Sequence, residues 1–197
     1  MKTIDFVKLR QQLDEAVTYA DFVAARCLAD EGLVNAQYQE NLNEIMYFRA
    51  QREIIDENYE EAIKYLGLAI KYNPSDGASY NDRALCVFES TGNEDQALAD
   101  FDKGIAIEPD YATIHHNKGW LLNKLGRHEE AISCFNKSLE LEAGRAVTYE
   151  NLADVYLNLG AKQEAIKAFQ NALKYLNRNY TEIKEQIEDK LNVLLSE

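Results

Sequence analysis

The sequence predicts an all-α fold, an α-solenoid of antiparallel helix pairs with a helical cap at each end. Four segments of one pattern begin at Glu60, Asp95, Glu129 and Gln163, in steps of 34 or 35 residues. A period of this length is typical of stacked units that bury a shared core. Only two prolines occur in 197 residues, so the composition permits many long helices.

The four repeating segments are expected to be the second helix of each pair. Residues of one type recur in register within them, and their spacing places them on one face of a helix. The small residues at this face allow close packing, and the larger apolar residues fill the space beside them. The three sets are Ala62, Ala97, Ala131 and Ala165; Leu66, Phe101, Phe135 and Phe169; and Ala69, Gly104, Ser138 and Ala172.

A first helix is expected before each second helix. Three of the first helices end at a glycine that suits a left-handed C-terminal position, and the earliest has Glu57-Asn58 there, with Asn58 the better choice. Pro74 and Pro109 mark the ends of the first two pairs, since proline cannot continue a helix. The predicted pairs are 43–56/59–72, 77–90/94–107, 112–125/128–141 and 146–159/162–176.

One residue is inserted in the second pair. Ala84 and Gly92 are eight residues apart, whereas the corresponding residues of the third and fourth pairs are seven apart. The insertion falls within Cys86–Thr91. We expect a π-type bulge or a looser turn there.

The two ends keep helical character without the clean repeat. Residues 1–42 carry two amphipathic runs and are expected to form a helical cap or a degenerate repeat. Residues 180–197 carry the stripe Ile183, Ile187, Leu191 and Leu194, which predicts a helix that covers the last pair. A dimerisation helix is the alternative for this segment.

Taken together, these features resemble the tetratricopeptide repeat, a unit of 34 residues with two antiparallel helices and small residues where they cross. The resemblance implies a right-handed superhelix whose first helices line a concave groove that binds proteins. It assigns four repeats to 43–76, 77–111, 112–145 and 146–179, between the two caps. The sequence departs from the family pattern at Ala143 and Asn177, which stand in place of the closing proline.

Charge and motifs exclude several function classes. The net charge of −13 disfavours binding to nucleic acid or to anionic membranes, and residues 43–111 alone hold fifteen acidic and six basic side chains. Three separated cysteines suggest neither a disulfide framework nor a zinc site. Phosphate-binding and metalloprotease motifs are absent, so no enzyme, cofactor or metal is expected. The N-terminus lacks a signal-like apolar run, which predicts a cytoplasmic protein.

The resemblance places candidate partner-binding residues on the first helices. Asn117 and Asn151 occupy the position at which the family holds an extended peptide, and Trp120 is expected to be partly exposed. His116 is expected to face the groove. The candidates are Tyr47, Phe48, Gln51, Asn81, Asp82, Leu85, Phe88, His116, Asn117, Trp120, Asn123, Glu150, Asn151 and Asp154.

The candidate surface predicts the charge of the partner. Together with Glu44 it holds four carboxylates and no lysine or arginine, so a neutral or basic protein segment fits better than an acidic one. Members that grip acidic chaperone tails use cationic side chains that this chain lacks at the matching places. The predicted function is a protein-binding scaffold or adaptor. A secretion-chaperone-like holder of an unfolded segment and a self-assembling homo-oligomeric scaffold are the alternatives.

Overall fold

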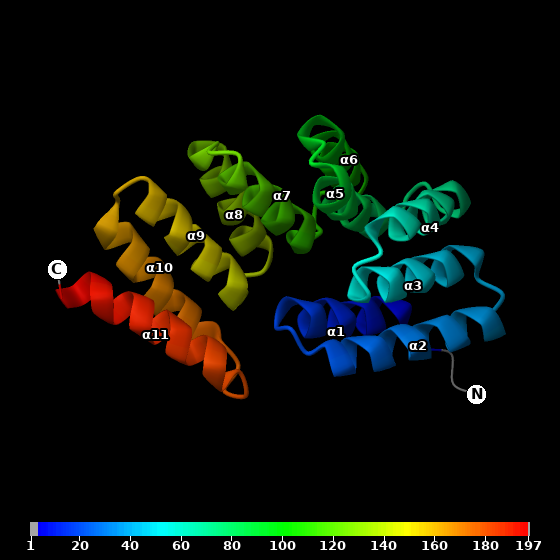
Figure 1. The fold of residues 1–197 in the computed structure, drawn as a ribbon, viewed down its shortest axis with the longest axis horizontal. Coiled ribbons are helices and arrows are strands. Elements are labelled where there is room, and N and C mark those ends of the chain that lie inside the picture. The colour runs from blue at the N-terminus through cyan, green and yellow to red at the C-terminus, as the bar shows by residue number, and fades with distance from the viewer. Residues whose placement is uncertain (1–3, 197) are drawn as a thin grey trace. The chain divides into compact units, whose positions relative to one another are not determined.

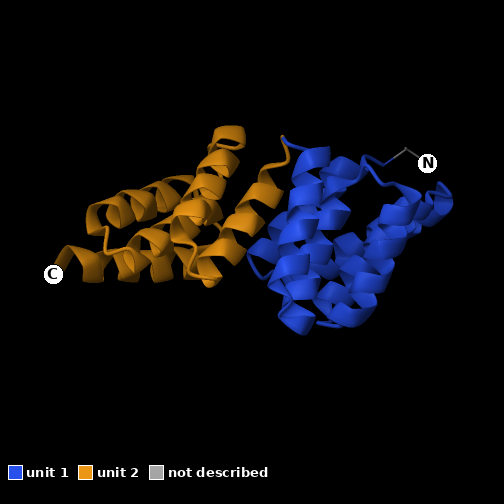
Figure 2. Ribbon diagram, turned by 90° about the horizontal axis from the view of Figure 1, so that it is seen from above, with its two compact units in different colours: residues 1–109 blue, residues 110–197 orange. Residues whose placement is uncertain are grey.

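The computed structural model describes residues 4–196, and these residues form eleven α-helices and no strand. The chain divides into two compact units, residues 1–109 and 110–197 (Figure 2). Figure 1 shows that successive helices within each unit run antiparallel. The predicted all-α fold of antiparallel helix pairs is therefore confirmed.

Unit 1 holds the first three helix pairs. Two of them, α3 with α4 and α5 with α6, correspond to the first two predicted pairs and begin and end within two residues of the expected positions. Residues 6–38 form a further antiparallel pair ahead of them. The helices are α1 (Phe6–Thr18), α2 (Phe22–Tyr38), α3 (Leu42–Ile55), α4 (Tyr59–Tyr72), α5 (Gly77–Thr91) and α6 (Glu94–Ile107).

Unit 2 holds two helix pairs and a final single helix. The apolar stripe of that helix packs as expected on the last pair: Ile187 is 1% exposed, and it joins a cluster that contains Phe169. The helices are α7 (Ala112–Lys124), α8 (His128–Leu141), α9 (Ala146–Asn158), α10 (Lys162–Tyr175) and α11 (Thr181–Ser196).

The repeated residues of the second helices form the core of each unit. Leu66, Phe101, Phe135 and Phe169 all have no exposed surface, as do the four alanines one turn earlier. Small residues on the first helices make room for these large side chains. A Cβ atom on Gly119 would lie 3.0 Å from the ring of Phe135, so the two helices α7 and α8 approach closely at this glycine.

The turns between paired helices use left-handed residues. Gly92, Gly126 and Gly160 have positive φ, as expected from their positions. In the turn from α3 to α4, the left-handed residue is Glu57 with φ of 59°, so the expectation that Asn58 takes this role is wrong. Asn58 instead precedes α4, and its backbone N–H donates to the Glu53 carbonyl.

The inserted residue lies in the last turn of α5. The helix continues to Thr91 without a π-bulge, so that alternative is wrong. Gly92 N–H donates to the Phe88 carbonyl, and Asn93 N–H donates to the Thr91 hydroxyl. The corresponding turn after α7 instead has the longer bond from Arg127 N–H to the Leu122 carbonyl. The extra residue is thus taken up at the helix end.

Candidate binding surfaces

The candidate residues on the first helices differ widely in accessibility. Five of them are buried, and their side chains pack or hydrogen-bond within their own unit: Tyr47, Phe48, Gln51, Asn81 and His116. The others are at least partly accessible. They are Asp82, Leu85, Phe88, Asn117, Trp120, Asn123, Glu150, Asn151 and Asp154. A direct role in contacting a partner is therefore compatible with the second group only.

Phe48 faces away from any open surface. Its side chain has no exposed area, and its ring lies against α2 at Gly32, where an added Cβ atom would come within 2.3 Å of the ring. The rings of Phe6 and Tyr47 flank it, with centroids at 5.9 and 5.4 Å. Phe48 is thus part of the core that joins α1, α2 and α3.

An arginine from α1 binds two carboxylates, one in the first turn of α3 and one just before α5. Arg10 donates to both oxygens of Glu44, at 2.9 and 3.1 Å, and to both oxygens of Asp76, at 2.9 and 3.2 Å. Its guanidinium also lies 3.6 Å from the centre of the Tyr47 ring. We call Arg10, Glu44 and Asp76 the Arg10 cluster. It corrects the expectation that no lysine or arginine meets the carboxylates of this surface.

The Arg10 cluster is largely removed from water. The side chains of Arg10, Glu44 and Asp76 are 14, 13 and 6% exposed. Burial raises the pKa of Glu44, and Arg10 opposes that rise. Burial alone would lower the pKa of Arg10, but Tyr47, Asp76 and Glu44 raise it above its ordinary value. The contact with Arg10 thus offsets part of the cost of burying the Glu44 carboxylate.

Asp76 precedes α5 but does not cap that helix with its side chain. Besides Arg10, its carboxylate accepts bonds from the Asn43 amide at 3.0 Å and from the Ser79 hydroxyl at 2.7 Å. With four donors around two oxygens, Asp76 is held in place by α1, α3 and α5 together. This residue thus links α1 to the first turns of α3 and α5.

The hydrogen-bond partners that the structure records for the Asp82 carboxylate are all neutral. Its carboxylate accepts from Gln51 at 2.5 Å and from Asn81 at 2.8 Å, and Tyr47 is a further hydrogen-bond partner. Burial raises the pKa of Asp82 to about 6, although the bonds from Asn81, Tyr47 and Gln51 oppose the rise. The negative charge of Asp14 adds to it. Asp82 thus titrates closer to neutral pH than an ordinary aspartate does.

His116 is a buried neutral side chain in unit 2, so the expectation that it faces the groove is wrong. Its Nδ1 lies 2.9 Å from the Thr148 hydroxyl, and its Nε2 lies 3.3 Å from the Asn151 amide nitrogen. An amide nitrogen can only donate, so Nε2 accepts and Nδ1 carries the proton. Burial, with the charge of Arg145 as a smaller cause, lowers the pKa of His116 to about 3. The imidazole therefore holds Asn151 at every physiological pH.

A lysine from α11 contacts the carboxylates of α9. Lys190 Nζ lies 3.2 Å from Glu150 and 3.4 Å from Asp154, and it also lies 5.5 Å from the centre of the Phe169 ring. All three charged side chains keep substantial exposure, with 42% for Lys190 and 38% for Asp154. This is a second cation that the candidate list did not contain.

Trp120 and Asn123 lie further along α7. Trp120 is partly buried, and Lys124 Nζ lies 4.9 Å from its ring centre. Asn123 Oδ1 lies 2.9 Å from His128 Nδ1 and accepts from Asn158 at 3.1 Å. Asn123 therefore ties the ends of α7, α8 and α9 together, whereas Trp120 keeps the partial exposure that was expected of it.

Several possible sites receive no support from the described residues. No group of three or more histidine, cysteine or acidic side chains among them is placed to hold a metal ion. Within residues 4–196, no helix combines the length and apolarity that crossing a membrane requires. Burial raises the pKa of the Cys86 thiol, so this cysteine is a poor nucleophile.

The sequence reasoning missed the residues that organise these surfaces. Arg10 and Lys190 lie in the end segments, outside the repeated pattern, and their partners are 34 to 66 residues away. Asp76 was not among the candidate residues. A signal was present only for Gly32, because a glycine in mid-helix often marks a close approach.

The comparisons agree with this architecture. Two family models, each described as tetratricopeptide repeat, match residues 49–112 and 110–178. Over 64 residues the chain is 34% identical to Hsp70-Hsp90 organizing protein 3 of Arabidopsis thaliana. That match takes in 32% of this chain and 11% of the plant protein, so the chain corresponds to a small part of that relative.

Solved structures show the same fold at low identity. A thermophilic tetratricopeptide-repeat protein of Thermus thermophilus superposes with a TM-score of 0.73 at 17% identity, over 96% of this chain and all of that one. The pilF protein of Pseudomonas aeruginosa gives 0.71 at 22% identity, over 80% of this chain and 69% of that one. YrrB, described as having an unusual peptide-binding site, gives 0.58 at 14% identity, over 88% of both chains. With two matching family models and this fold, the chain belongs to the tetratricopeptide-repeat family.

Proposed function

We propose that this chain is a protein-binding scaffold without catalytic activity, and that it holds an extended partner segment on the first helices of unit 2. Proteins of the tetratricopeptide-repeat family generally mediate protein–protein interaction. The observation that supports the proposal most is the fixed carboxamide of Asn151. Its amide nitrogen is committed to His116, while the residue keeps partial exposure.

A fixed carboxamide suits an extended peptide. Because one N–H of Asn151 is bound to a neutral histidine, the orientation of its Oδ1 is set before a partner arrives. A side-chain oxygen and the second N–H can then pair with a backbone amide of the partner. Pre-organisation of this kind reduces the ordering cost of binding.

Trp120 supplies the apolar part of the same surface. It lies on α7, is partly exposed, and has Lys124 beside its ring. Aromatic side chains in such settings are frequent anchors at protein interfaces. We propose that an apolar side chain of the partner packs on Trp120 while the partner backbone pairs with Asn151.

We propose that the partner segment is neutral or basic, because of the local charge at Glu150 and Asp154. These two carboxylates share one exposed lysine, Lys190, so one negative charge remains unbalanced by this contact. A basic side chain of the partner can compete for either carboxylate, whereas an acidic segment would meet two like charges.

The test uses peptides selected on the chain itself. A library of random peptides is selected on the immobilised full chain, and the dissociation constant of a selected peptide is measured for variants. Asn151→Ala is expected to weaken binding about tenfold, the effect of one lost hydrogen bond at the upper end of its range. Trp120→Ala is expected to weaken it about thirtyfold, as for a central aromatic anchor.

Asn136→Ala is the matched control, because Asn136 is an exposed asparagine on the second helix α8. Circular dichroism and urea unfolding establish that each variant is folded. Selected peptides that bind all three variants as tightly as the unmodified chain would show that unit 2 does not hold its partner at Asn151 and Trp120.

A further inference from the structure

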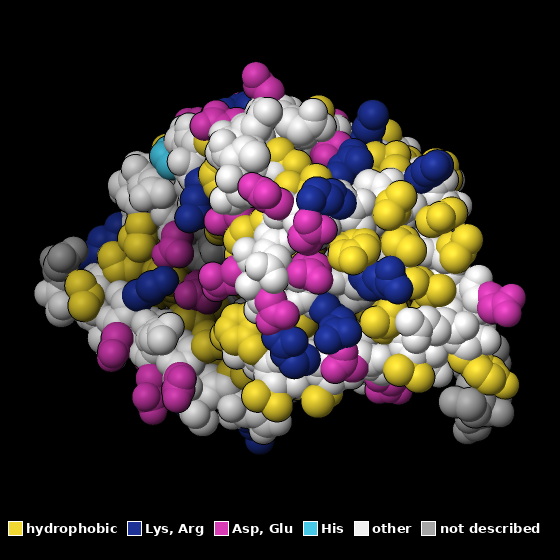
Figure 3. Space-filling view, turned by 45° about the vertical axis from the view of Figure 1, so that its right-hand side comes forward, with side chains coloured by type: hydrophobic (Ala, Val, Ile, Leu, Met, Phe, Trp, Pro, Cys, Tyr) yellow, Lys and Arg dark blue, Asp and Glu magenta, His cyan; other side chains and the backbone are white. Residues whose placement is uncertain are grey.

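The outer face of α2 carries a row of exposed apolar side chains. Val23, Val34 and Tyr38 are 80, 58 and 66% exposed, and Cys27 is exposed as well. Their spacing places all four on one side of the helix, opposite the buried Ala25. We call these four residues the α2 stripe. Figure 3 shows that hydrophobic side chains reach the surface on the side of unit 1 that carries α2, α3 and α4.

The positions of the α2 stripe are mostly polar in the other second helices. The helices can be aligned on the first fully buried alanine of each, which is Ala25 in α2 and Ala62, Ala97, Ala131 and Ala165 in α4, α6, α8 and α10. Val23 then corresponds to Glu60, Asp95, Glu129 and Gln163. Val34 corresponds to Lys71, Ala106, Glu140 and Lys174. The repeat therefore does not require valine at these places, and an exposed apolar row confined to one helix indicates a contact surface.

Negative charge flanks the middle of the α2 stripe. Residues 21–40 hold four acidic side chains and one basic side chain, Arg26, which already binds the carboxylate that ends α3. Asp30 is 51% exposed and shares Arg52 of α3 at 3.1 Å. Glu31 is exposed, and its carboxylate forms no ion pair or hydrogen bond with any of residues 4–196. The carboxylate of Glu31 is therefore available to a basic group from outside the chain.

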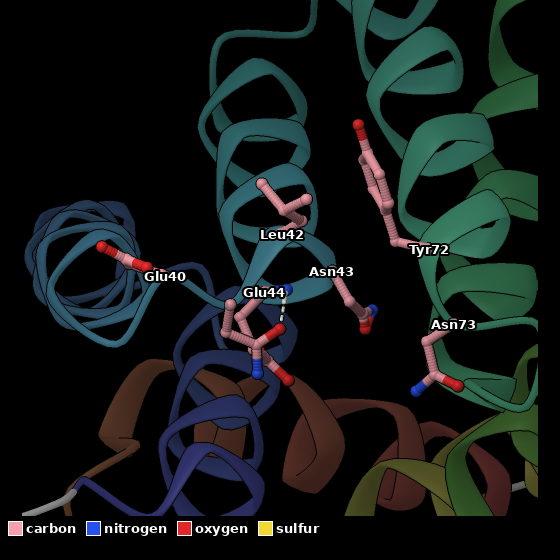
Figure 4. A pocket seen from close by; sticks show the side chains of 7 residues that line it. Glu40, Leu42, Asn43, Glu44, Tyr72 and Asn73 are labelled. Atoms are coloured by element: carbon pink, nitrogen blue, oxygen red, sulfur yellow. Dashed lines mark hydrogen bonds between the residues drawn. The ribbon is translucent and has the colours of Figure 1, made fainter.

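The pocket at the start of α3 and the end of α4 is a different feature of unit 1. Its volume is about 460 Å³. Its acidic groups do not converge on a common point, because Glu44 is bound to Arg10 and Figure 4 shows the Glu40 side chain pointing away from Asn43 and Asn73. The α2 stripe, in contrast, combines exposed apolar surface with an available carboxylate.

A second copy of the chain fits the α2 stripe poorly. Two stripes paired antiparallel about their middle would align the apolar residues of both copies. The same arrangement would bring the Glu31 side chains of the two copies together, with Asp30 beside them. Like charges at the middle of an interface disfavour it. An anionic lipid surface would meet the same carboxylates.

We propose that the α2 stripe binds an amphipathic helix of a partner protein, with apolar residues along one face and a lysine or arginine at its middle. The apolar residues pack on Val23, Val34 and Tyr38, while the basic side chain pairs with Glu31. The stripe is about 22 Å long at the rise of an α-helix, which matches about four turns of a partner helix. The site lies on a second helix of unit 1, so it is additional to the surface proposed for unit 2.

The test uses synthetic helical peptides, so no natural partner has to be known. Their leucines have the spacing of the α2 stripe, and the two central residues are lysine, glutamine or glutamate in three matched versions. Binding to the full chain is followed as protection of Cys27 from iodoacetamide, read by mass spectrometry, because Cys86 is buried and Cys134 is partly buried. The lysine peptide is expected to slow alkylation of Cys27 and to bind about tenfold more tightly than the glutamate peptide.

Val34→Ser is the variant that tests the apolar contact. It should weaken all three peptides about fivefold, because it removes apolar surface that the peptide covers. Val193→Ser is the matched control, since Val193 on α11 is also 58% exposed. Glu31→Gln should weaken the lysine peptide about threefold and leave the glutamine peptide unchanged. Glu60→Gln controls for the loss of an exposed glutamate.

Several results would overturn the proposal. They are unchanged alkylation of Cys27 with the lysine peptide, equal affinity for the lysine and glutamate peptides, and equal effects of Val34→Ser and Val193→Ser. A dimer that sedimentation equilibrium detects and that Val34→Ser dissociates would assign the stripe to a second copy instead. Protection of Cys27 by phosphatidylcholine vesicles but not by peptide would assign it to lipid. None of these results would bear on Asn151 and Trp120 in unit 2.

Discussion

The first and last helices each bring a cation to carboxylates on a first helix, but the two contacts differ in burial and geometry. Arg10 is 14% exposed, makes two bidentate contacts and stacks on Tyr47. Lys190 is 42% exposed and reaches Glu150 and Asp154 at 3.2 and 3.4 Å. A buried pair holds structure because separating it leaves an uncompensated charge. An exposed pair is worth little and can be exchanged for contacts with a partner.

The helix starts show the same difference between the units. In unit 1, Asp5, Asp21, Asn41 and Asn93 accept a bond from the helix they precede. In unit 2, α7, α8, α9 and α10 begin at residues that make no such bond. Four of the six helices of unit 1 are thus capped by a side chain whereas α7 to α10 are not, and the buried Arg10 cluster of unit 1 contrasts with the exposed Lys190 contact of unit 2. The four predictions below test that distinction.

The largest effect is expected from the core of unit 2. Phe135→Ala removes a fully buried ring that lies beside Gly119 and 5.5 Å from the His116 ring. It should lower the free energy of unfolding by about 4 kcal/mol, since the helices cannot close the space fully. Hydrogen exchange should then become faster in α9 as well as in α7 and α8. Exchange that stays slow throughout unit 2 would contradict the shared core.

Arg10→Ala is expected to cost about 3 kcal/mol, because it leaves Glu44 and Asp76 buried with no cation. Urea unfolding at neutral pH measures the loss. The double variant Arg10→Met with Glu44→Gln, which removes both charges of one pair, should recover part of it. If the single variant unfolds at the same urea concentration as the unmodified chain, the Arg10 cluster does not hold unit 1 together.

The pH dependence of stability should carry a signature of Asp82. Burial raises its pKa to about 6, so between about pH 4 and 6 the folded state binds more protons than the unfolded state. This contribution is therefore fully present below about pH 4 and is lost as pH rises through about 6, with a size on the order of 1–2 kcal/mol. Unfolding measured at several pH values should show it.

Asp82→Asn should flatten the curve between pH 4 and 6. Asp95→Asn, which removes an exposed carboxylate in the first turn of α6, controls for the loss of one negative charge. A variant curve that keeps the full slope would mean that another carboxyl in unit 1 is responsible. Glu44 and Glu108 are the alternatives, because burial raises the pKa of both.

The smallest effect is expected at Lys190. Lys190→Ala should change the free energy of unfolding by less than about 1 kcal/mol, since the pair is exposed. The same variant should bind a basic selected peptide more tightly, because Glu150 and Asp154 no longer have an internal cation. A large loss of stability would place Lys190 in the same class as Arg10 and remove the contrast between the two ends.

The helices could be predicted because their signals are local. The spacing of Ala62, Ala97 and Ala131 and the glycines that follow the first helices fix the helix pairs to within two residues. The site could not be predicted in the same way. Arg10 meets Asp76 across 66 positions, and nothing in the local sequence of either residue indicates the contact.

The burial of individual candidate side chains could not be predicted from the sequence either. The periodic pattern places Phe48 and His116 on the first helices, but it does not show which neighbour covers them. Phe48 is covered through Gly32, and His116 through Thr148 and Asn151. Both cases depend on helices that lie outside the repeat in which the residue stands, so only a three-dimensional structure reveals them.

The extra residue near the end of α5 has a consequence for how such arrays can change in length. A residue added in mid-helix would rotate everything after it by about 100° and turn core positions toward water. Here the shift is dissipated within Thr91 and Gly92, and α6 resumes with Ala97 and Phe101 buried as in the other pairs. The turn after a first helix is thus a place where the chain can gain a residue while the next helix keeps the same residues facing the core.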